Sequence, residues 1–282
     1  MSWQAFRFRE DRLPVALCVA LLALDAGAYF LLDSAWLAAG WMALGIFPKA
    51  CICAYGHHHQ HLATFHQAWL NRLLEVMYGF QTGITSHAWF LHHVVGHHRH
   101  YLDQQVDESR WQRRDGSKMN VLEYGLVVAL TGYPRAWQAG RDYPKARRIF
   151  LFMLLVQVAL LAMLFWHDWR NALLIFLLPM AISLYITAWH TYYHHAGLST
   201  EDDYVACNNI MHRWYNRLTG NLGYHTAHHL RGSVHWSRLP ELHAKIAAKI
   251  PAERYHQPCL PFRWMPGGEH SPTAAPPPTA TH

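Results

Sequence analysis

The sequence predicts an all-α integral membrane protein with four transmembrane helices in two hairpins and a cytoplasmic helical cap that holds a histidine-rich dimetal site. Three observations lead to this fold class. Of the 282 residues, 52% are hydrophobic and only 15% are charged, whereas about a quarter of the residues of a soluble globular protein are charged. The apolar residues gather in four runs of helical length. Finally, the 24 histidines equal the lysines and arginines combined.

The four apolar runs pair into two hairpins. Each run has about 20 residues, which is enough to cross the hydrocarbon core of a bilayer as a helix. Very short turns separate the first run from the second and the third from the fourth, and this arrangement disfavours buried helices of a soluble protein. A second span follows the first run, so the first run does not read as a cleaved signal peptide. The runs cover residues 13–32, 35–55, 149–166 and 172–189.

Basic residues orient these hairpins. Of the 24 lysines and arginines, only Arg170 falls in a loop on the far side of the predicted membrane. The positive-inside rule therefore places both termini and residues 56–148 in the cytoplasm. Polar residues interrupt the segment 69–90, which we expect to be an interfacial or re-entrant helix rather than a fifth span. With this distribution, the formal charge of +6 indicates a membrane surface rather than nucleic acid as the partner.

The remaining sequence suggests one domain with an extension. We expect a membrane domain over residues 1–255 and a C-terminal extension over 256–282, whose tail GGEHSPTAAPPPTATH is rich in Pro, Ala and Thr and is expected to be disordered. The five cysteines show no disulfide framework. Cys51 and Cys53 lie inside a predicted span, where a packing role is expected.

Histidines occur in four clusters, all on the predicted cytoplasmic side. If each cluster presents one helical face, the number of histidines on that face is two in GHHHQH, three in HHVVGHHRHY, at least one in WHTYYHHAGL and three in GYHTAHHL. Nine imidazoles are too many for one four-coordinate ion and suit two metals. Imidazole by itself admits zinc, copper, iron, nickel or manganese. The HExxH signature of zinc proteases is absent from the sequence.

The spacing of these histidines resembles that of the membrane fatty acid desaturase superfamily, which includes acyl desaturases, alkane monooxygenases and related hydroxylases. The three histidine boxes of that superfamily match residues in the first, second and last clusters, and TYYHHAGL resembles a segment of alkane monooxygenases that supplies one more ligand. The resemblance extends over most of residues 50–245. The metal ligands that it implies are His57, His61, His93, His97, His98, His195, His225, His228 and His229.

The resemblance implies an enzyme that uses two iron ions, O₂ and two electrons to remove hydrogens from an alkyl chain, most simply as a fatty acyl desaturase. The same site would also serve a hydroxylase or a fatty acid decarboxylase that forms a 1-alkene. An alternative function of another class is that of a membrane metal transporter. Transport needs metal ligands along a path through the membrane, but polar residues at mid-membrane depth, such as Asp25 and Gln157, are few. Expected partners are a fatty acyl substrate, membrane lipid and a separate electron donor of ferredoxin, rubredoxin or cytochrome type. The expected location is a bacterial inner membrane.

Five further residues are candidates for contacts with the ligands. Asp107 and Glu108 follow the second box, where acidic residues often stand in this superfamily, and would hydrogen-bond ligand imidazoles and orient them; the alternative is a solvated acidic loop. Asn221 would orient a metal-bound water or, in the preferred interpretation, cap the helix of the last box. His100 and His190 are the remaining histidines that a small error in register would bring into the ligand set.

Overall fold

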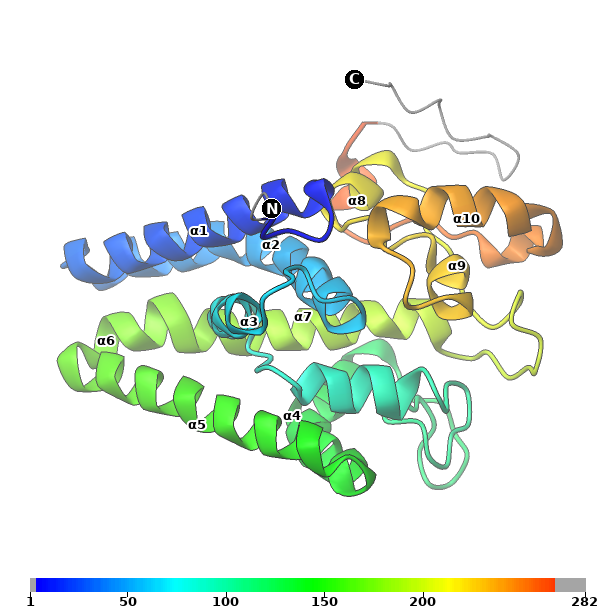
Figure 1. The fold of residues 1–282 in the computed structure, drawn as a ribbon, viewed down its shortest axis with the longest axis horizontal. Helices are drawn as coiled ribbons and strands as arrows, with labels where there is room; N and C mark the ends of the chain where they lie inside the picture. Colours follow the sequence, from blue (N-terminus) through cyan, green and yellow to red (C-terminus); the bar gives the residue numbers. More distant parts are fainter. Residues whose placement is uncertain (1–3, 267–282) are drawn as a thin grey trace. The chain divides into compact units, whose positions relative to one another are not determined.

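The computed structural model describes residues 4–266, and within this range it is helical and forms no strand. The predicted all-α fold is confirmed (Figure 1). The α-helices are α1 (Arg12–Leu31), α2 (Ala35–His61), α3 (Ala68–Thr82), α4 (Val121–Ala139), α5 (Pro144–His167), α6 (Trp169–Asn171), α7 (Leu178–His195), α8 (Arg213–Leu218), α9 (His225–Leu230) and α10 (Leu239–Ile246). The π-helices are η2 (Phe90–His97) and η4 (Ala172–Leu177), and the 3₁₀ turns are η1 (Arg9–Asp11), η3 (Gly140–Asp142), η5 (Trp236–Arg238), η6 (Ala247–Lys249), η7 (Ala252–Arg254) and η8 (Phe262–Trp264).

Four helical stretches in the described part of the chain are long and apolar enough to cross a membrane. They are Arg9–Leu31, Ala35–His61, Pro144–His167 and Trp169–His195, so the four predicted spans are confirmed and no fifth is found among these residues. Many of their large apolar side chains point outward, for example Phe152 and Leu155, which are 64% and 67% exposed. Such surfaces are stable against lipid rather than water. The chain is therefore a membrane protein; its orientation remains a prediction.

The chain divides into two compact units, Met1–Tyr192 and Tyr193–His282, with the boundary near the end of α7. The predicted division into residues 1–255 and 256–282 stays a prediction, and the tail 267–282 lies outside the described residues. In the first unit, α3 is seen end-on in Figure 1 and crosses the direction of the spans. It is mostly buried and packs against α1, α2 and α5. Gly83 ends it with φ +70°, where an added Cβ would lie 2.3 Å from the Met180 carbonyl oxygen.

A buried ion pair joins α1, α2 and α3. The Lys49 ammonium and the Asp25 carboxylate contact each other, and both side chains are essentially inaccessible to solvent. Gln81 accepts from Lys49 Nζ at 3.1 Å and donates to Asp25 Oδ2 at 3.0 Å, and Trp41 Nε1 donates to Asp25 Oδ1 at 2.9 Å. Because charge in the bilayer interior must be paired, this network explains how α1, α2 and α3 carry polar groups among apolar neighbours.

Candidate metal centre

The first histidine group stands where a span meets the π-helix η2. Helix α2 continues beyond the apolar run that ends at residue 55, so His57 and His61 lie one turn apart on the same rigid helix as the second span. His93 and His98 come from η2 and its C-cap. These four histidines each offer a ring nitrogen, and the nitrogens lie within 4.8 Å of one another.

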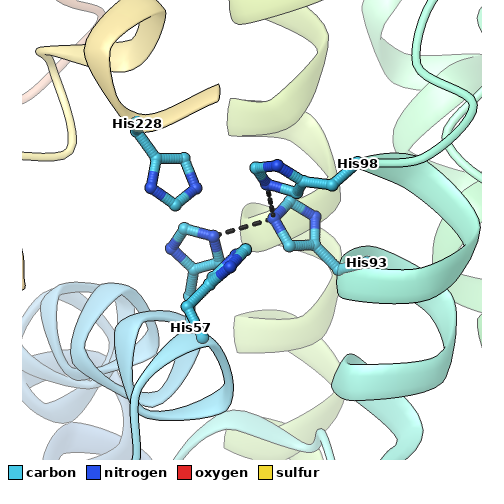
Figure 2. A group of neighbouring side chains, drawn as sticks. His57, His93, His98 and His228 are labelled. Carbon is cyan, nitrogen blue, oxygen red and sulfur yellow. Dashed lines mark hydrogen bonds between the residues drawn. The ribbon is translucent and has the colours of Figure 1, made fainter. Parts of the chain in front are cut away.

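The π-helix explains how the second cluster aims two imidazoles at one point. The His98 backbone N–H donates to the His93 carbonyl oxygen at 2.8 Å, five residues back, and this is the hydrogen bond that defines a π-turn. This turn therefore places the two side chains on the same side of the helix, and their Nε2 atoms are 3.0 Å apart. His57 Nε2 approaches His93 Nε2 at 2.8 Å. Figure 2 shows the rings of His57, His93 and His98 directed toward one another.

These distances fit a bound metal. Two imidazole ligands that each lie about 2.0–2.1 Å from one ion are roughly 3 Å apart when their bonds are near a right angle. Burial is the largest cause that lowers the pKa of His93 well below its usual value, and the neighbouring rings of His57 and His98 lower it further. The ring is therefore neutral at pH 7 and offers a lone pair, which is the form that binds metal.

His97 lies beside this group and carries the contact predicted for Asp107. Its ring centroid is 5.1 Å from that of His93, and its side chain is fully buried. His97 Nδ1 lies 2.9 Å and 3.1 Å from the two carboxylate oxygens of Asp107. When Nδ1 donates to a carboxylate, the ring is held in the tautomer with its lone pair on Nε2. Asp107 is buried, so the alternative of a solvated loop is wrong for this residue.

The contacts of Glu108 differ from those of Asp107. Its carboxylate lies 3.8 Å from Arg110, and its backbone carbonyl accepts from Arg135. A Cβ added to Gly96 of the second box would lie 2.4 Å from Glu108 Cγ. Glu108 thus packs closely on the backbone of the histidine box, where only glycine leaves enough room. Burial is the largest influence on its carboxyl group and raises the pKa of Glu108.

The second unit contains its own group, formed by His195, Cys207, His225 and His229. His195 is the last residue of α7, while His225 and His229 are one turn apart on α9. His195 Nε2 lies 3.0 Å from His225 Nε2 and 3.1 Å from His229 Nε2. This is the spacing expected for ligands of one ion. The α7 segment and α9 thus bring together the histidines predicted from two distant clusters.

The opposite nitrogen of His195 faces the loop after α7. Nδ1 lies 3.4 Å from the Ala206 carbonyl oxygen and 3.9 Å from Cys207 Sγ. Cys207 Sγ thus approaches His195 from its Nδ1 side, and it still lies within 4.8 Å of one ring nitrogen of each histidine in this group. Burial raises the pKa of the Cys207 thiol well above its usual value, so the group is a neutral thiol. No role was predicted for Cys207, because a cysteine 12 positions from the nearest ligand gives no spacing signal.

Three histidines near the predicted ligands are placed differently. His194 Nδ1 lies 2.9 Å from the Asn208 carbonyl oxygen, and Nε2 lies 3.3 Å from the Tyr215 hydroxyl, so both of its ring nitrogens have protein partners. This supports the choice of His195 over its neighbour. His190 stands beside the Trp189 ring, and His100 is exposed. Neither belongs to a metal-binding group among the described residues.

The helix of the last box is short and is capped from elsewhere. His225, His228 and His229 lie on α9, as their spacing predicted, and the His228 ring is 5.6 Å from those of the other two. The predicted cap at Asn221 is wrong. Asn221 has φ +61°, and its amide donates to the Trp236 carbonyl oxygen at 3.2 Å.

The side chain that caps α9 is Asn209. Its Oδ1 accepts from the Thr226 backbone N–H at 3.0 Å, and its Nδ2 donates to Thr226 Oγ1 at 2.8 Å. Thr226 is the second residue of α9, where a backbone N–H has no partner inside the helix. Asn209 is fully buried and lies 17 residues before Thr226, so no local sequence pattern reveals this cap.

Comparison with known proteins agrees with these two groups. The family model described as fatty acid desaturase matches residues 34–260, which is more than half of the chain. No curated protein matches this sequence. Proteins of the matched family are metal-binding oxidoreductases with lipid or acyl substrates. The family expected from the histidine spacing is confirmed, and the chain belongs to the fatty acid desaturase family.

Proposed function

We propose that this protein is an O₂-dependent fatty acyl desaturase with two iron ions. The observation that carries the proposal is the convergence of ring nitrogens in two separate groups, centred on His93 and His195, in a chain of this family. We propose all nine histidines named in the sequence analysis as ligands. Iron is preferred over zinc because the C–H bonds of an alkyl chain require a redox-active metal that reacts with O₂.

The bound iron would supply the oxidant, and the protein would supply position and environment. The neutral, buried His93 ring presents a lone pair, and the Asp107 carboxylate holds the proton of His97 on Nδ1. In the second unit, the Ala206 carbonyl oxygen lies beside His195 Nδ1, as the Asp107 carboxylate lies beside His97 Nδ1. Burial of His57, His93, His195 and His225 keeps water from the metal-binding nitrogens, and this limits side reactions of the oxidant.

The substrate proposed here is the alkyl chain of a fatty acid, which the four spans would admit from the bilayer. Two electrons would come from a separate donor of ferredoxin, rubredoxin or cytochrome type. The polar groups of the spans do not favour a metal transporter. Asp25 and Lys49 are paired with each other and with Gln81, whereas a transport path needs polar groups that an ion can reach.

Product analysis tests this proposal. Cells that express the chain should accumulate unsaturated acyl chains, detected by mass spectrometry, and cells with His93→Ala should not. Gain of one oxygen atom in the product would instead identify a hydroxylase, and loss of one carbon with a terminal double bond would identify a decarboxylase. Intact metal content with unaltered lipids and no O₂ consumption in the presence of electron donors would contradict an oxygen-dependent enzyme.

We also propose that both termini and residues 56–148 face the cytoplasm. Ser34 and Ser117 make a matched pair, because each is a serine outside the helices in a turn or loop. In intact cells, a membrane-impermeant thiol reagent should label Ser34→Cys and miss Ser117→Cys. Labelling of Ser117→Cys without permeabilisation would contradict this orientation.

A further inference from the structure

Helix α4 has an unusual outer face. The side chains that recur every fourth residue on its outer side are Leu122, Leu126, Leu130 and Pro134. The three leucines are 65%, 53% and 71% exposed. An exposed helix face of this length in contact with water is normally polar or charged. This stripe carries no charge, and α4 is not one of the four membrane-spanning stretches found among the described residues.

The inner face of α4 is occupied by the protein itself. Tyr124, Val128 and Ala136 are buried there, and Ala136 belongs to a core cluster with Leu91 and Phe150. The outer leucines therefore do not form part of this core. A helix that is apolar on both faces requires a second apolar environment on its outer side.

We infer that α4 lies in the plane of the membrane surface and inserts Leu122, Leu126 and Leu130 among phospholipid chains. Continuity with a span supports lipid as the occupant. After α4, the chain turns at Gly140–Asp142 and enters α5 at Pro144, which is the start of the third span. Trp137 near the end of α4 is 37% exposed, and the Arg147 guanidinium of α5 lies 3.2 Å from the centre of its ring. Tryptophan and arginine are typical of the level of the lipid headgroups.

The charges around this turn fit the same occupant. Arg141, Lys145 and Arg148 are exposed between the end of α4 and the first turns of α5, where they outnumber the one exposed carboxylate, that of Asp142. The next outward side chains of α5, Phe152 and Leu155, are apolar. Cations next to an apolar stripe match anionic headgroups above acyl chains. The chemistry thus fits a bilayer that contains anionic phospholipid.

This position of α4 has a consequence for the second histidine box. The Tyr133 hydroxyl donates to the Gly83 carbonyl at 2.8 Å and accepts from Thr85 N–H at 3.1 Å. The Tyr124 hydroxyl donates to the Ser109 carbonyl at 3.1 Å. Helix α4 therefore holds both ends of the segment that carries His93. Lipid contact along α4 would fix the depth of this histidine relative to the membrane surface, whichever reaction the site performs.

Depth-dependent fluorescence quenching tests the inference. The full-length protein with Leu126→Cys or Leu130→Cys is labelled with a small fluorophore and placed in nanodiscs of phosphatidylcholine and phosphatidylglycerol. Ser117→Cys, in an exposed loop, is the aqueous control, and Leu155→Cys, on a span, is the lipid control. The unsubstituted chain gives the background from native cysteines. Unchanged metal content and a monodisperse elution profile show that each variant is folded.

Both α4 probes should be quenched by a lipid with a nitroxide near its headgroup and should be several-fold less sensitive to iodide than the Ser117→Cys probe. Replacement of phosphatidylglycerol by phosphatidylcholine should reduce the lipid quenching. Iodide sensitivity equal to that of Ser117→Cys would overturn the inference. Protection that develops only after a soluble redox protein is added would also overturn it, because the stripe would then be a protein-docking surface.

Discussion

The two histidine groups reach the same geometry from different local structures. In the first unit, His93 Nε2 lies 2.8 Å and 3.0 Å from two other Nε2 atoms; in the second unit, His195 Nε2 lies 3.0 Å and 3.1 Å from its two. The first group is built on a long span and a π-helix, and the second on the end of α7 and the six-residue helix α9. Converging ring nitrogens, rather than a common backbone, are what the two have in common.

The groups differ in the residues that contact the Nδ1 atoms of their imidazoles. The first has a charged partner, Asp107, on His97, whereas the second has a backbone carbonyl and the Cys207 thiol behind His195. Both a carboxylate and a carbonyl fix the tautomer and raise the basicity of the imidazole, but only the carboxylate adds a negative charge beside the ring. We therefore expect metal binding in the first group to be more sensitive to substitution of the residue that contacts its imidazole.

The largest effects should follow removal of either central histidine. We expect His93→Ala and His195→Ala each to abolish turnover and to reduce the iron content from two toward one per chain, because each ring belongs to a different group. Elemental analysis of purified protein measures this. His167→Ala, at the last residue of α5, is the control and should keep both ions. Loss of iron to the same extent in that control would contradict the assignment.

Asp107→Asn should have the next largest effect. Asparagine keeps an acceptor oxygen for His97 Nδ1 but lacks the negative charge, so the imidazole becomes less basic and metal affinity should fall about 10–100-fold. Competition with a chelator measures this change. Asp103→Asn is a matched control in an exposed position of the same segment, and it should leave the affinity unchanged. Equal affinity in Asp107→Asn and Asp103→Asn would show that the contact with His97 has no effect on the metal.

His194→Ala should reduce stability more than it reduces metal binding. The substitution leaves the Asn208 carbonyl and the Tyr215 hydroxyl without their imidazole partner, at a cost of about 1–3 kcal/mol. Thermal unfolding measures this loss of stability. Elemental analysis then compares the iron content of His194→Ala with that of His195→Ala. If His194→Ala loses iron while His195→Ala retains it, the assignment of the third cluster is off by one residue and must be redrawn around His190 and His194.

Cys207→Ala should have the smallest effect. The nine proposed ligands are all histidines, so this change should cost only about 1 kcal/mol of packing and should leave iron content unaltered. A fall in iron content comparable with that of His195→Ala would make Cys207 a ligand, and the second group would then differ from the first in chemistry as well as in scaffold.

The spans could be predicted from the sequence because their apolar runs are long, and the spacing of His57 and His61 placed both on one helical face although the apolar run of the second span is shorter than its helix. That apolar run ends at residue 55, whereas α2 continues to His61. Hydropathy decreases at the polar residues 56–61, yet the buried imidazoles pack and the backbone stays helical. The π-turn of the second box could not be predicted, because α- and π-helical spacing both place His93 near His97 and His98.

The ligand clusters were visible in the sequence because boxed histidines keep short, regular spacings. The residues that support them were less visible. Asp107 follows its box closely and was predicted, but Cys207 and Asn209 act through contacts that join a loop to distant helices. Asn221 is a residue type that caps helices, but it lies four residues before α9 and its amide donates to the Trp236 carbonyl oxygen. Tertiary contacts of this kind carry no periodic signal.

One measurement tests the central claim most directly: elemental analysis combined with iron spectroscopy on the purified, full-length protein. We predict close to two irons per chain in a coordination shell of imidazole nitrogens, with parallel loss of iron and activity in His93→Ala and His195→Ala. One zinc per chain, with no iron bound after reconstitution, would contradict the account.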